Sequence, residues 1–460
     1  MKNNILAILL FLTSVCFAQT RSELFFEKGS RVCFVGNSIT YAGEFHHNIM
    51  LYHITRFPGQ PVSFYNCGVP GDVTSGVLQR MEDDILVNQP THAVIMLGMN
   101  DVNRSLYKSK PTANADTLRL REEAINTYKA NLEKIVNIFL SKNIQVVLQK
   151  PSIYDQTAKR PTPNYFGVND ALKTCADFIG ELAEKYKLPT VDYWTIMTQI
   201  NREMQKKDSL FTITGPDRVH PASAGHLVMA YQFLKSEGAP RYVSKIVVDK
   251  TIKKSSKKSL NCEIKSITMR QNGVSFVARE NALPFPFSEN QQKGLELVPF
   301  LNDLNVELLQ VHDLNPGKYQ LAIDDQIIGV FSEDQFNKGI NMVEYVNTPQ
   351  YRQAVKIREI LSDLWKMEAA LRGIKYIEYN RYFKESPNKE NLSLLKTHLD
   401  SVFTMKYKIS PFNSQLEKYI TDKPQQKEYE RSSDELRQKV YLLATLLDHV
   451  FVITLKSNSN

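Results

Sequence analysis

The chain has 460 residues, more than one compact core usually holds, so two or three folded units are expected. Hydrophobic residues make up 42% and charged residues 23% of the chain, which excludes a mainly disordered or low-complexity protein. The formal net charge of +8 is modest for this length, and the densest basic run, 253–258, has no interleaved aromatic residue. Nucleic-acid binding is therefore not predicted.

The first residues have the pattern of a secretory signal peptide. Lys2 precedes an apolar run over 5–12, and Cys16 and Ala18 place small residues at the two key positions of a cleavage site. We expect residues 1–18 to be removed on export, which leaves a periplasmic or secreted protein that begins at Gln19. The apolar run is too short to span a bilayer and no later segment is transmembrane in character, so stable membrane insertion is not expected.

Between residues 31 and 234, short apolar runs alternate with longer amphipathic ones. Strands are expected at 31–35, 62–65, 92–97, 144–148 and 190–192. Helices are expected at 44–57, 74–87, 118–140 and 171–186, and after Pro221. Strands separated by helices predict a parallel sheet that is covered on both faces. Any chemistry is then expected in the loops at the carboxyl ends of the strands.

The pattern changes after residue 241. Strands are expected at 245–249, 263–269, 273–278, 306–311, 319–323 and 327–331. From residue 349 helical spacing dominates, as in 354–375 and 436–450. The aromatic residues of this region are explained by helical packing rather than by ligand binding; they are Trp365, Tyr376, Tyr379 and Tyr382. The predicted units are an α/β domain over 24–240, a β-rich unit over 241–348 and a helical region over 349–460.

Candidate chemistry lies in segments at the ends of predicted strands. Ser38 follows the first strand, where its hydroxyl lies beside backbone N–H groups, although a Ser before a helix is more often an N-cap. Gly71 and Asn100 follow the next two strands. An N–H group and an amide can hold an oxyanion there, although turn formation is the commoner role of both residue types. Asp217 precedes His220 by three residues, a spacing that lets a carboxylate orient an imidazole.

Taken together, four short blocks resemble the SGNH hydrolase superfamily, also called GDSL esterases and lipases. The blocks are Gly36-Asn37-Ser38-Ile39, Gly68-Val69-Pro70-Gly71-Asp72-Val73, Gly98-Met99-Asn100-Asp101 and Asp217-Arg218-Val219-His220-Pro221. The resemblance covers about residues 31–234. It departs from the family pattern at Asn37, where Asp is usual, and at Val73, where Thr is frequent. It implies a three-layer α/β/α, flavodoxin-like fold for residues 24–240.

The resemblance also implies the roles of five residues. Ser38 is expected to be the nucleophile, His220 the base and Asp217 its orienting partner, and the oxyanion hole is expected to comprise Ser38, Gly71 and Asn100. The expected reaction is hydrolysis of a carboxylic ester without a cofactor, in particular removal of acetyl groups from glycans. A lipase or phospholipase and a non-catalytic glycan-binding or cell-envelope protein remain as alternatives. The acyl group, the alcohol, the oligomeric state and the role of the C-terminal half stay open.

No metal site is predicted. His46, His47 and His53 are close in sequence, but adjacent histidines point apart on a helix. Four cysteines remain after the predicted cleavage, namely Cys33, Cys67, Cys175 and Cys262. Their spacing does not match a metal-binding pattern, and whether any two of them form a disulfide stays open.

Overall fold

The computed structural model describes residues 24–107, 113–250, 254–255, 258–387, 389–406 and 411–456. The predicted signal peptide, 1–18, lies outside these residues, as does part of the basic run 253–258. Of the helices described, none combines the length and hydropathy that a bilayer crossing requires. The four described cysteines are free thiols, and only Cys262 is partly exposed.

The N-terminal half is built on a five-stranded parallel sheet with strand order β2-β1-β3-β4-β5. Its strands are β1 (Arg31–Gly36), β2 (Ser63–Gly68), β3 (His92–Met96), β4 (Gln145–Lys150) and β5 (Thr190–Asp192). Alternate side chains of β1 enter different cores: Val32 and Phe34 pack on one face, Cys33 and Val35 on the other. The central strands β1 and β3 are buried on both faces, which explains why they read as apolar runs.

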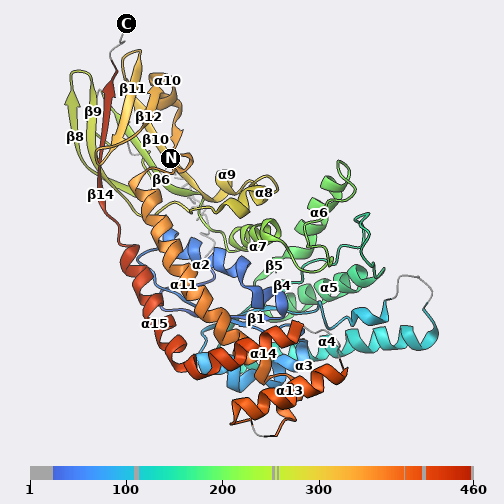
Figure 1. Ribbon diagram of the computed structural model, residues 1–460. Helices are drawn as coiled ribbons and strands as arrows, with labels where there is room; N and C mark the ends of the chain where they lie inside the picture. The colour runs from blue at the N-terminus through green and yellow to red at the C-terminus, as the bar shows by residue number, and fades with distance from the viewer. Residues whose placement is uncertain are drawn as a thin grey trace, which may run out of the picture.

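Helices cover the two faces and complete the three-layer α/β/α fold that the sequence predicts (Figure 1). They are α1 (Ser38–Ala42), α2 (Glu44–Arg56), α3 (Thr74–Gln79), α4 (Ala115–Ser141), α5 (Val168–Tyr186), α6 (Tyr193–Gln205) and α7 (Ser223–Ser236). Helices α2 and α7 pack with Val32 and Phe34, and α4 and α5 pack on the opposite face.

Two details of the helices differ from the prediction. The expected helix at 74–87 ends at Gln79 and continues as a π-helical turn, Met81–Ile85, and a 3-10 turn, Leu86–Asn88. Helix α6 was not predicted, although Tyr193, Met197 and Asn201 bury one side of it at a spacing of four residues.

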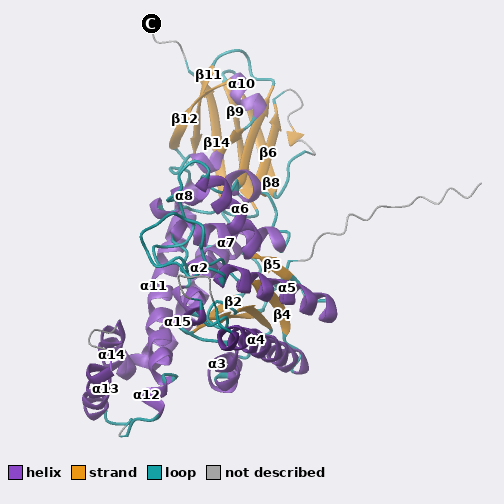
Figure 2. Cartoon of the chain, turned by 90° about the vertical axis from the view of Figure 1, so that its right-hand side faces the viewer, coloured by secondary structure: helices purple, strands orange, loops and turns teal. Residues whose placement is uncertain are grey.

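The second half contains two further sheets, which share one hydrophobic core. The four-stranded sheet has the order β13-β10-β6-β7 and comprises β6 (Tyr242–Asp249), β7 (Lys254–Ser255), β10 (Val306–His312) and β13 (Ile340–Asn341). The five-stranded sheet has the order β12-β11-β14-β9-β8 and comprises β8 (Cys262–Arg270), β9 (Gly273–Glu280), β11 (Lys318–Ile323), β12 (Gln326–Ser332) and β14 (Asp448–Leu455). Short helices connect them, namely α8 (Gln292–Leu295), α9 (Phe300–Leu304) and α10 (Glu333–Lys338). Figure 2 shows this β-rich unit at one end of the molecule.

The last strand corrects the prediction of a helix over 436–450. Helix α15 (Gln426–Leu443) ends within that range, and β14 then pairs antiparallel with both β9 and β11. The buried residues His449, Phe451 and Ile453 alternate along β14, as a strand requires. The predicted helical region, 349–460, therefore supplies a central strand to the β-rich unit.

The remaining helices are α11 (Pro349–Glu378), α12 (Arg381–Lys384), α13 (Leu392–Lys406) and α14 (Pro411–Asp422). Thr348 caps α11 by accepting the N–H of Tyr351, and Pro349 occupies its first turn. The helix has 30 residues, or about 45 Å of length. It packs against α15, α2 and β2, so it runs from the β-rich unit along the α/β domain (Figure 1).

Candidate active site

The first block forms a sharp turn from β1 into α1. A Cβ on Gly36 would lie 2.2 Å from the Thr40 hydroxyl oxygen and 2.8 Å from the Met96 carbonyl oxygen, so this position has room only for glycine. Asn37 is buried, and its side-chain oxygen accepts the N–H of Ile39 at 3.2 Å. The departure from the family pattern thus keeps an N-cap. Ser38 follows as the first residue of α1.

The Asp217–His220 block, distant in sequence from Ser38, lies next to it in the fold. His220 Nε2 lies 2.7 Å from Ser38 Oγ, and His220 Nδ1 hydrogen-bonds to the Asp217 carboxylate. The other carboxylate oxygen of Asp217 accepts the backbone N–H groups of Val219 and His220, each at 3.1 Å. Partial burial alone would raise the pKa of Asp217, but these hydrogen bonds outweigh it and lower the pKa below its ordinary value. Ser38, His220 and Asp217 thus form one hydrogen-bonded chain.

Arg218, between Asp217 and His220, has a structural role that sequence reasoning missed. Its side chain is buried, and its backbone φ of 69° lies in the left-handed region. The guanidinium donates to four backbone carbonyls, those of Asp155, Ala158, Arg160 and Thr162. It therefore fastens the loop that carries Asp217 and His220 to the segment 155–162.

The second and third blocks are tied to each other. Asn100 Nδ2 donates to the backbone oxygen of Asp72 at 2.9 Å, which uses one of the two N–H groups of the amide. Asp101 accepts the backbone N–H and the hydroxyl of Thr74, both at 2.7 Å, and the N–H of Gly98 at 3.0 Å. Gly71 is exposed at the tip of its loop with a φ of 76°. Gly71 and Asn100 thus belong to two adjoining loops.

The end of β2 packs directly on α1. A Cβ on Gly68 would lie 2.2 Å from the backbone nitrogen of Tyr41, so the two backbones meet without a side chain between them. Asn66 accepts the N–H of Gly68 at 2.9 Å and donates to the Tyr41 carbonyl at 3.0 Å. The loop that follows Gly68 is therefore held against the helix that begins with Ser38.

A cavity of about 260 Å³ lies beside Gly71. Its walls come from the glycine block, α3, the end of α11 and α12, and they include Gly71, Gln79, Tyr376, Tyr379, Asn380 and Lys384. The rings of Tyr41 and Tyr376 are 6.3 Å apart. Tyr376 and Tyr379 thus do more than pack a helix, because they line a space next to the glycine block. Trp365 does pack as predicted, stacked on His47 at 4.4 Å.

The histidines of α2 are structural. His46 Nε2 lies 3.0 Å from the Thr40 carbonyl oxygen, and its ring stacks on Phe34. Burial lowers the pKa of His46 to about 4 and that of His226, on α7, to about 3. His53 pairs with Glu237 at 2.9 Å.

Comparison with known proteins finds a family match for the α/β domain. Residues 32–233 match the family described as GDSL-like lipase/acylhydrolase. An acetylxylan esterase of Geobacillus stearothermophilus is 22% identical over 228 residues, which span 46% of this chain and 94% of that protein. The crystal structure of an acetylxylan esterase from the same organism superposes with a TM-score of 0.36 over 46% of this chain and 95% of that one, at 22% identity.

A further solved structure matches the chain beyond the α/β domain. It is that of a gut microbial diltiazem-metabolizing enzyme, which is 28% identical and superposes with a TM-score of 0.83. The match covers 95% of this chain and 100% of that one, so the likeness includes the β-rich unit and the C-terminal helices. Residues 32–233 thus form a domain of the SGNH/GDSL superfamily, and the protein is a carboxylic ester hydrolase.

Proposed function

We propose that the protein hydrolyses esters through Ser38, His220 and Asp217. The observation that carries the proposal is the 2.7 Å contact between His220 Nε2 and Ser38 Oγ, with Asp217 on the other ring nitrogen. His220 takes the hydroxyl proton as Ser38 Oγ attacks the ester carbonyl carbon, and it returns the proton to the departing alcohol. Water then attacks the acyl-enzyme with His220 again as base, which releases the carboxylic acid and restores Ser38.

The negative charge on the carbonyl oxygen needs donors during both steps. We assign this role to the backbone N–H groups of Ser38 and Gly71 and to the side-chain amide of Asn100. Loss of one such donor is expected to lower kcat by about 10²–10³-fold. Asn100→Ala should therefore lower kcat far more than it changes KM, as steady-state assays would show.

The acyl-transfer step is tested by labelling with a fluorophosphonate probe, which reacts with an activated serine. Wild-type protein should be labelled, and Ser38→Ala should not. Ser141→Ala is the matched control, because Ser141 is an exposed serine that donates to Ile138 at the end of α4. The proposal fails if the wild type stays unlabelled, or if Ser38→Ala is labelled as strongly as Ser141→Ala.

For the substrate we propose acetylated glycans. The similarity to an acetylxylan esterase supports an acetyl group on a sugar. The small cavity beside Gly71 supports it too, since its tyrosine rings and its amide side chains suit a sugar ring better than a fatty acyl chain. The full-length likeness to a diltiazem-metabolizing enzyme favours a second candidate, an esterase for small aromatic compounds such as diltiazem.

Three sets of substrates separate these candidates from a lipase. The assay compares kcat/KM for acetylated xylooligosaccharides, for diltiazem and for p-nitrophenyl esters from acetate to octanoate. A glycan deacetylase prefers the acetylated sugar, and an esterase for aromatic compounds consumes diltiazem faster. A rise of kcat/KM with acyl chain length would indicate a lipase and would exclude both proposals.

We further propose that the protein is exported after cleavage near Ala18. The pattern of residues 1–18 supports this. N-terminal sequencing of protein recovered from the periplasm or medium should begin at Gln19. Recovery of uncleaved protein from the cytoplasm alone would contradict it.

A further inference from the structure

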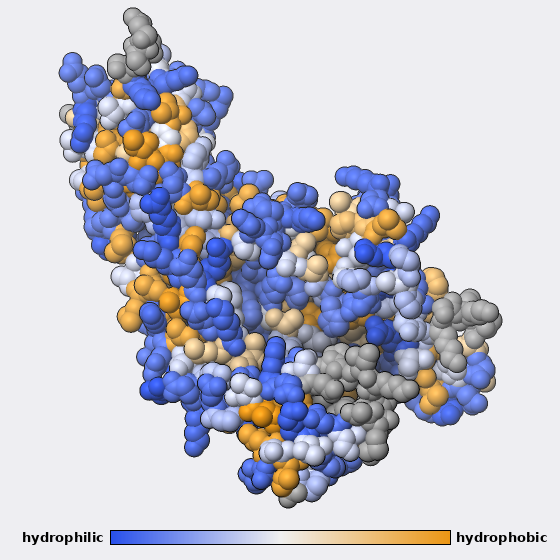
Figure 3. Space-filling model, in the orientation of Figure 1, coloured by the Kyte–Doolittle hydropathy of each residue, from blue (hydrophilic) through white to orange (hydrophobic). Residues whose placement is uncertain are grey.

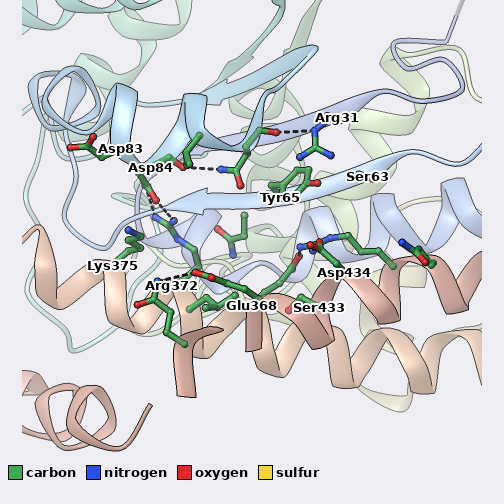
Figure 4. A pocket seen from close by; sticks show the side chains of 18 residues that line it. Arg31, Ser63, Tyr65, Asp83, Asp84, Glu368, Arg372, Lys375, Ser433 and Asp434 are labelled. Atoms are coloured by element: carbon green, nitrogen blue, oxygen red, sulfur yellow. Dashed lines mark hydrogen bonds and ion pairs between the residues drawn. The ribbon is translucent and has the colours of Figure 1, made fainter. Parts of the chain in front are cut away.

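A buried arginine of the C-terminal half reaches into the glycine block. Arg372, on α11, donates to the carbonyl oxygen of Gly68 twice, from Nε at 3.1 Å and from Nη2 at 2.9 Å. It also pairs with both carboxylate oxygens of Asp84, at 2.6 and 2.9 Å. Its side chain is only 7% exposed. In Figure 4 the side chain of Arg372 extends from α11 toward Asp84, below the sheet edge that carries Tyr65.

The contact continues to the other end of the glycine block. Asp84 also pairs with Arg80 at 2.6 Å, and Arg80 pairs with Asp72 at 2.8 Å. Arg80 donates in addition to the carbonyl of Gly36, two residues before Ser38, at 3.3 Å. The network thus binds the Gly68 carbonyl and the Asp72 carboxylate. These two residues lie on either side of Gly71 in the loop.

Asp84 stays ionised at the pH of ordinary assays. Burial alone would raise the pKa of Asp84, but the ion pairs with Arg372 and Arg80 outweigh it and hold the pKa at about 2. Charge-assisted hydrogen bonds in a buried site are stronger than neutral ones and have narrow geometric limits. Burial raises the pKa of the second carboxyl group, Asp72, although its ion pair with Arg80 opposes the shift.

Arginine is required for this geometry. One guanidinium meets a carbonyl and both oxygens of a carboxylate at once, because its N–H groups lie in one plane. A lysine keeps the charge beside Asp84 but cannot make all four contacts. Loss of the guanidinium leaves Asp84 paired with Arg80, so no buried carboxylate is left alone. The hydrogen bonds to the Gly68 carbonyl are lost instead.

We propose that Arg372 is a positioning residue for the oxyanion-binding loop: it holds Gly68–Asp72 so that the Gly71 N–H stays aimed at the reacting oxygen. This inference rests on the function proposed above for Ser38 and Gly71. It assigns the C-terminal half a part in the reaction, because Arg372 of α11 contacts the loop at Gly68. A displacement of about 1 Å at such a site can cost about 10²-fold in rate.

The test compares Arg372→Lys and Arg372→Gln with Arg437→Gln. Arg437, on α15, is a buried arginine that pairs with Glu368 of α11 at 2.6 Å and lies 4.6 Å from the Tyr65 ring centre. Its loss weakens the packing of α11 against α15 through partners outside the glycine loop. Thermal unfolding measures the structural cost of each variant, and the assays run well below the lowest melting temperature.

Both Arg372 variants should lower kcat for p-nitrophenyl acetate by about 10- to 100-fold, with KM changed by less than about threefold. Their affinity for a trifluoromethyl ketone, which forms a tetrahedral oxyanion adduct with an active serine, should fall in proportion to kcat/KM. Arg437→Gln should keep kcat within about twofold of wild type even where it melts earlier.

An unchanged kcat in the Arg372 variants overturns the inference, as does an equal loss of kcat in Arg437→Gln. If Arg372→Gln does not fold, Arg372→Lys decides; if neither folds, the role is structural and the inference is rejected. Ser38→Ala, assayed in parallel, separates the two proposals. Activity retained in Ser38→Ala defeats the proposed function, whereas an inactive Ser38→Ala beside fully active Arg372 variants defeats only the positioning role.

Discussion

At the scale of single residues, the loop of Asp217 and His220 depends on the arginine between them. A non-glycine residue with a positive φ carries a conformational cost of about 1–3 kcal/mol unless its surroundings compensate. Arg218 has a φ of 69°, and its guanidinium supplies that compensation through four hydrogen bonds to the segment 155–162. The backbone of Arg218 also accepts the N–H of Asp155 at 2.9 Å. The orientation of His220 toward Ser38 therefore relies on contacts outside the four sequence blocks.

Arg218→Lys should lower both activity and stability. A single ammonium cannot reach four carbonyls, so some of them lose their donor, at a cost of about 1–3 kcal/mol in the free energy of unfolding. We expect kcat/KM to fall by about 10-fold or more as the loop loosens. Urea unfolding and steady-state assays measure the two effects. Arg202→Lys, an exposed position on α6, is the control, and equal behaviour of the two variants would refute the role given to Arg218.

At the scale of elements, a pair of buried carboxyl groups lies where β9 and β10 meet the start of α11. Glu280 accepts hydrogen bonds from Ser244 and from Gln350 of α11, the latter at 2.7 Å. Burial, and then the neighbouring Glu280, raises the pKa of Glu307 well above its ordinary value, although Arg56 opposes the shift. Glu307 thus retains a proton to a higher pH in the folded protein than in the unfolded chain.

Glu307→Gln should stabilise the protein at alkaline pH. An unfolded glutamate ionises above about pH 4.5, so the folded state is increasingly disfavoured as pH rises from there through the raised pKa of Glu307. The amide removes this titration. We expect the free energy of unfolding to rise by at least about 1 kcal/mol at pH 8 and by less at pH 4.5. The control Glu359→Gln, at an exposed position, should leave the free energy of unfolding unchanged at both pH values. If Glu307→Gln raises the free energy of unfolding equally at about pH 4.5 and pH 8, titration of Glu307 is ruled out as the cause.

At the scale of the whole molecule, the α/β domain shares its core with the C-terminal half. One hydrophobic cluster joins Phe45 and Phe233 of the α/β domain to Phe300, to Leu361 of α11 and to Val440 of α15. The face drawn in Figure 3 is mostly hydrophilic, as expected if the apolar side of α11 is turned inward. The three predicted units, 24–240, 241–348 and 349–460, therefore all contribute side chains to one core.

A chain of residues 24–240 alone should not form a stable soluble domain. Removal of α11 and of the segment around Phe300 uncovers apolar side chains on α2 and α7, which favours aggregation. Solubility and the cooperativity of thermal unfolding test this against a chain of residues 24–456, in which every described residue after 23 is kept. A soluble 24–240 fragment with a single sharp transition would contradict the shared core.

The buried histidines should make the stability of the whole protein fall in mild acid. Because the pKa of His46 drops from 6.5 to about 4 on folding, the unfolded state binds more protons within that interval. The contribution of His46 to the free energy of unfolding is thus full above pH 6.5 and is lost as pH falls toward 4. Each tenfold difference in proton affinity between the folded and unfolded states corresponds to about 1.4 kcal/mol. Urea unfolding across this range should show a smaller loss for His46→Gln than for wild type. His312→Gln, outside this core, should follow the wild type, and parallel curves for all three would refute the explanation.

Much of the α/β domain could be predicted because its signals are local. The predicted strand at 190–192 coincides with β5, and the other four strands of the sheet differ from prediction only by a few residues at their ends. The prediction of a helix through 450 was wrong for the opposite reason. The segment that became β14 is a strand because β9 and β11 accept it between them, and those partners lie far away in the chain.

By itself, then, the sequence determined the layered α/β fold, since buried strands and strand-end turns have local signals. The resemblance of four short blocks led to Ser38, Gly71, Asn100, Asp217 and His220 as the proposed site residues. The tertiary structure alone decided which other side chains support them. Arg372 reaches Gly68 across 304 residues of chain, and no pattern near either residue predicts the contact. Such a partnership depends on how distant elements pack, because a guanidinium and a carbonyl attract each other only once the fold has brought them together.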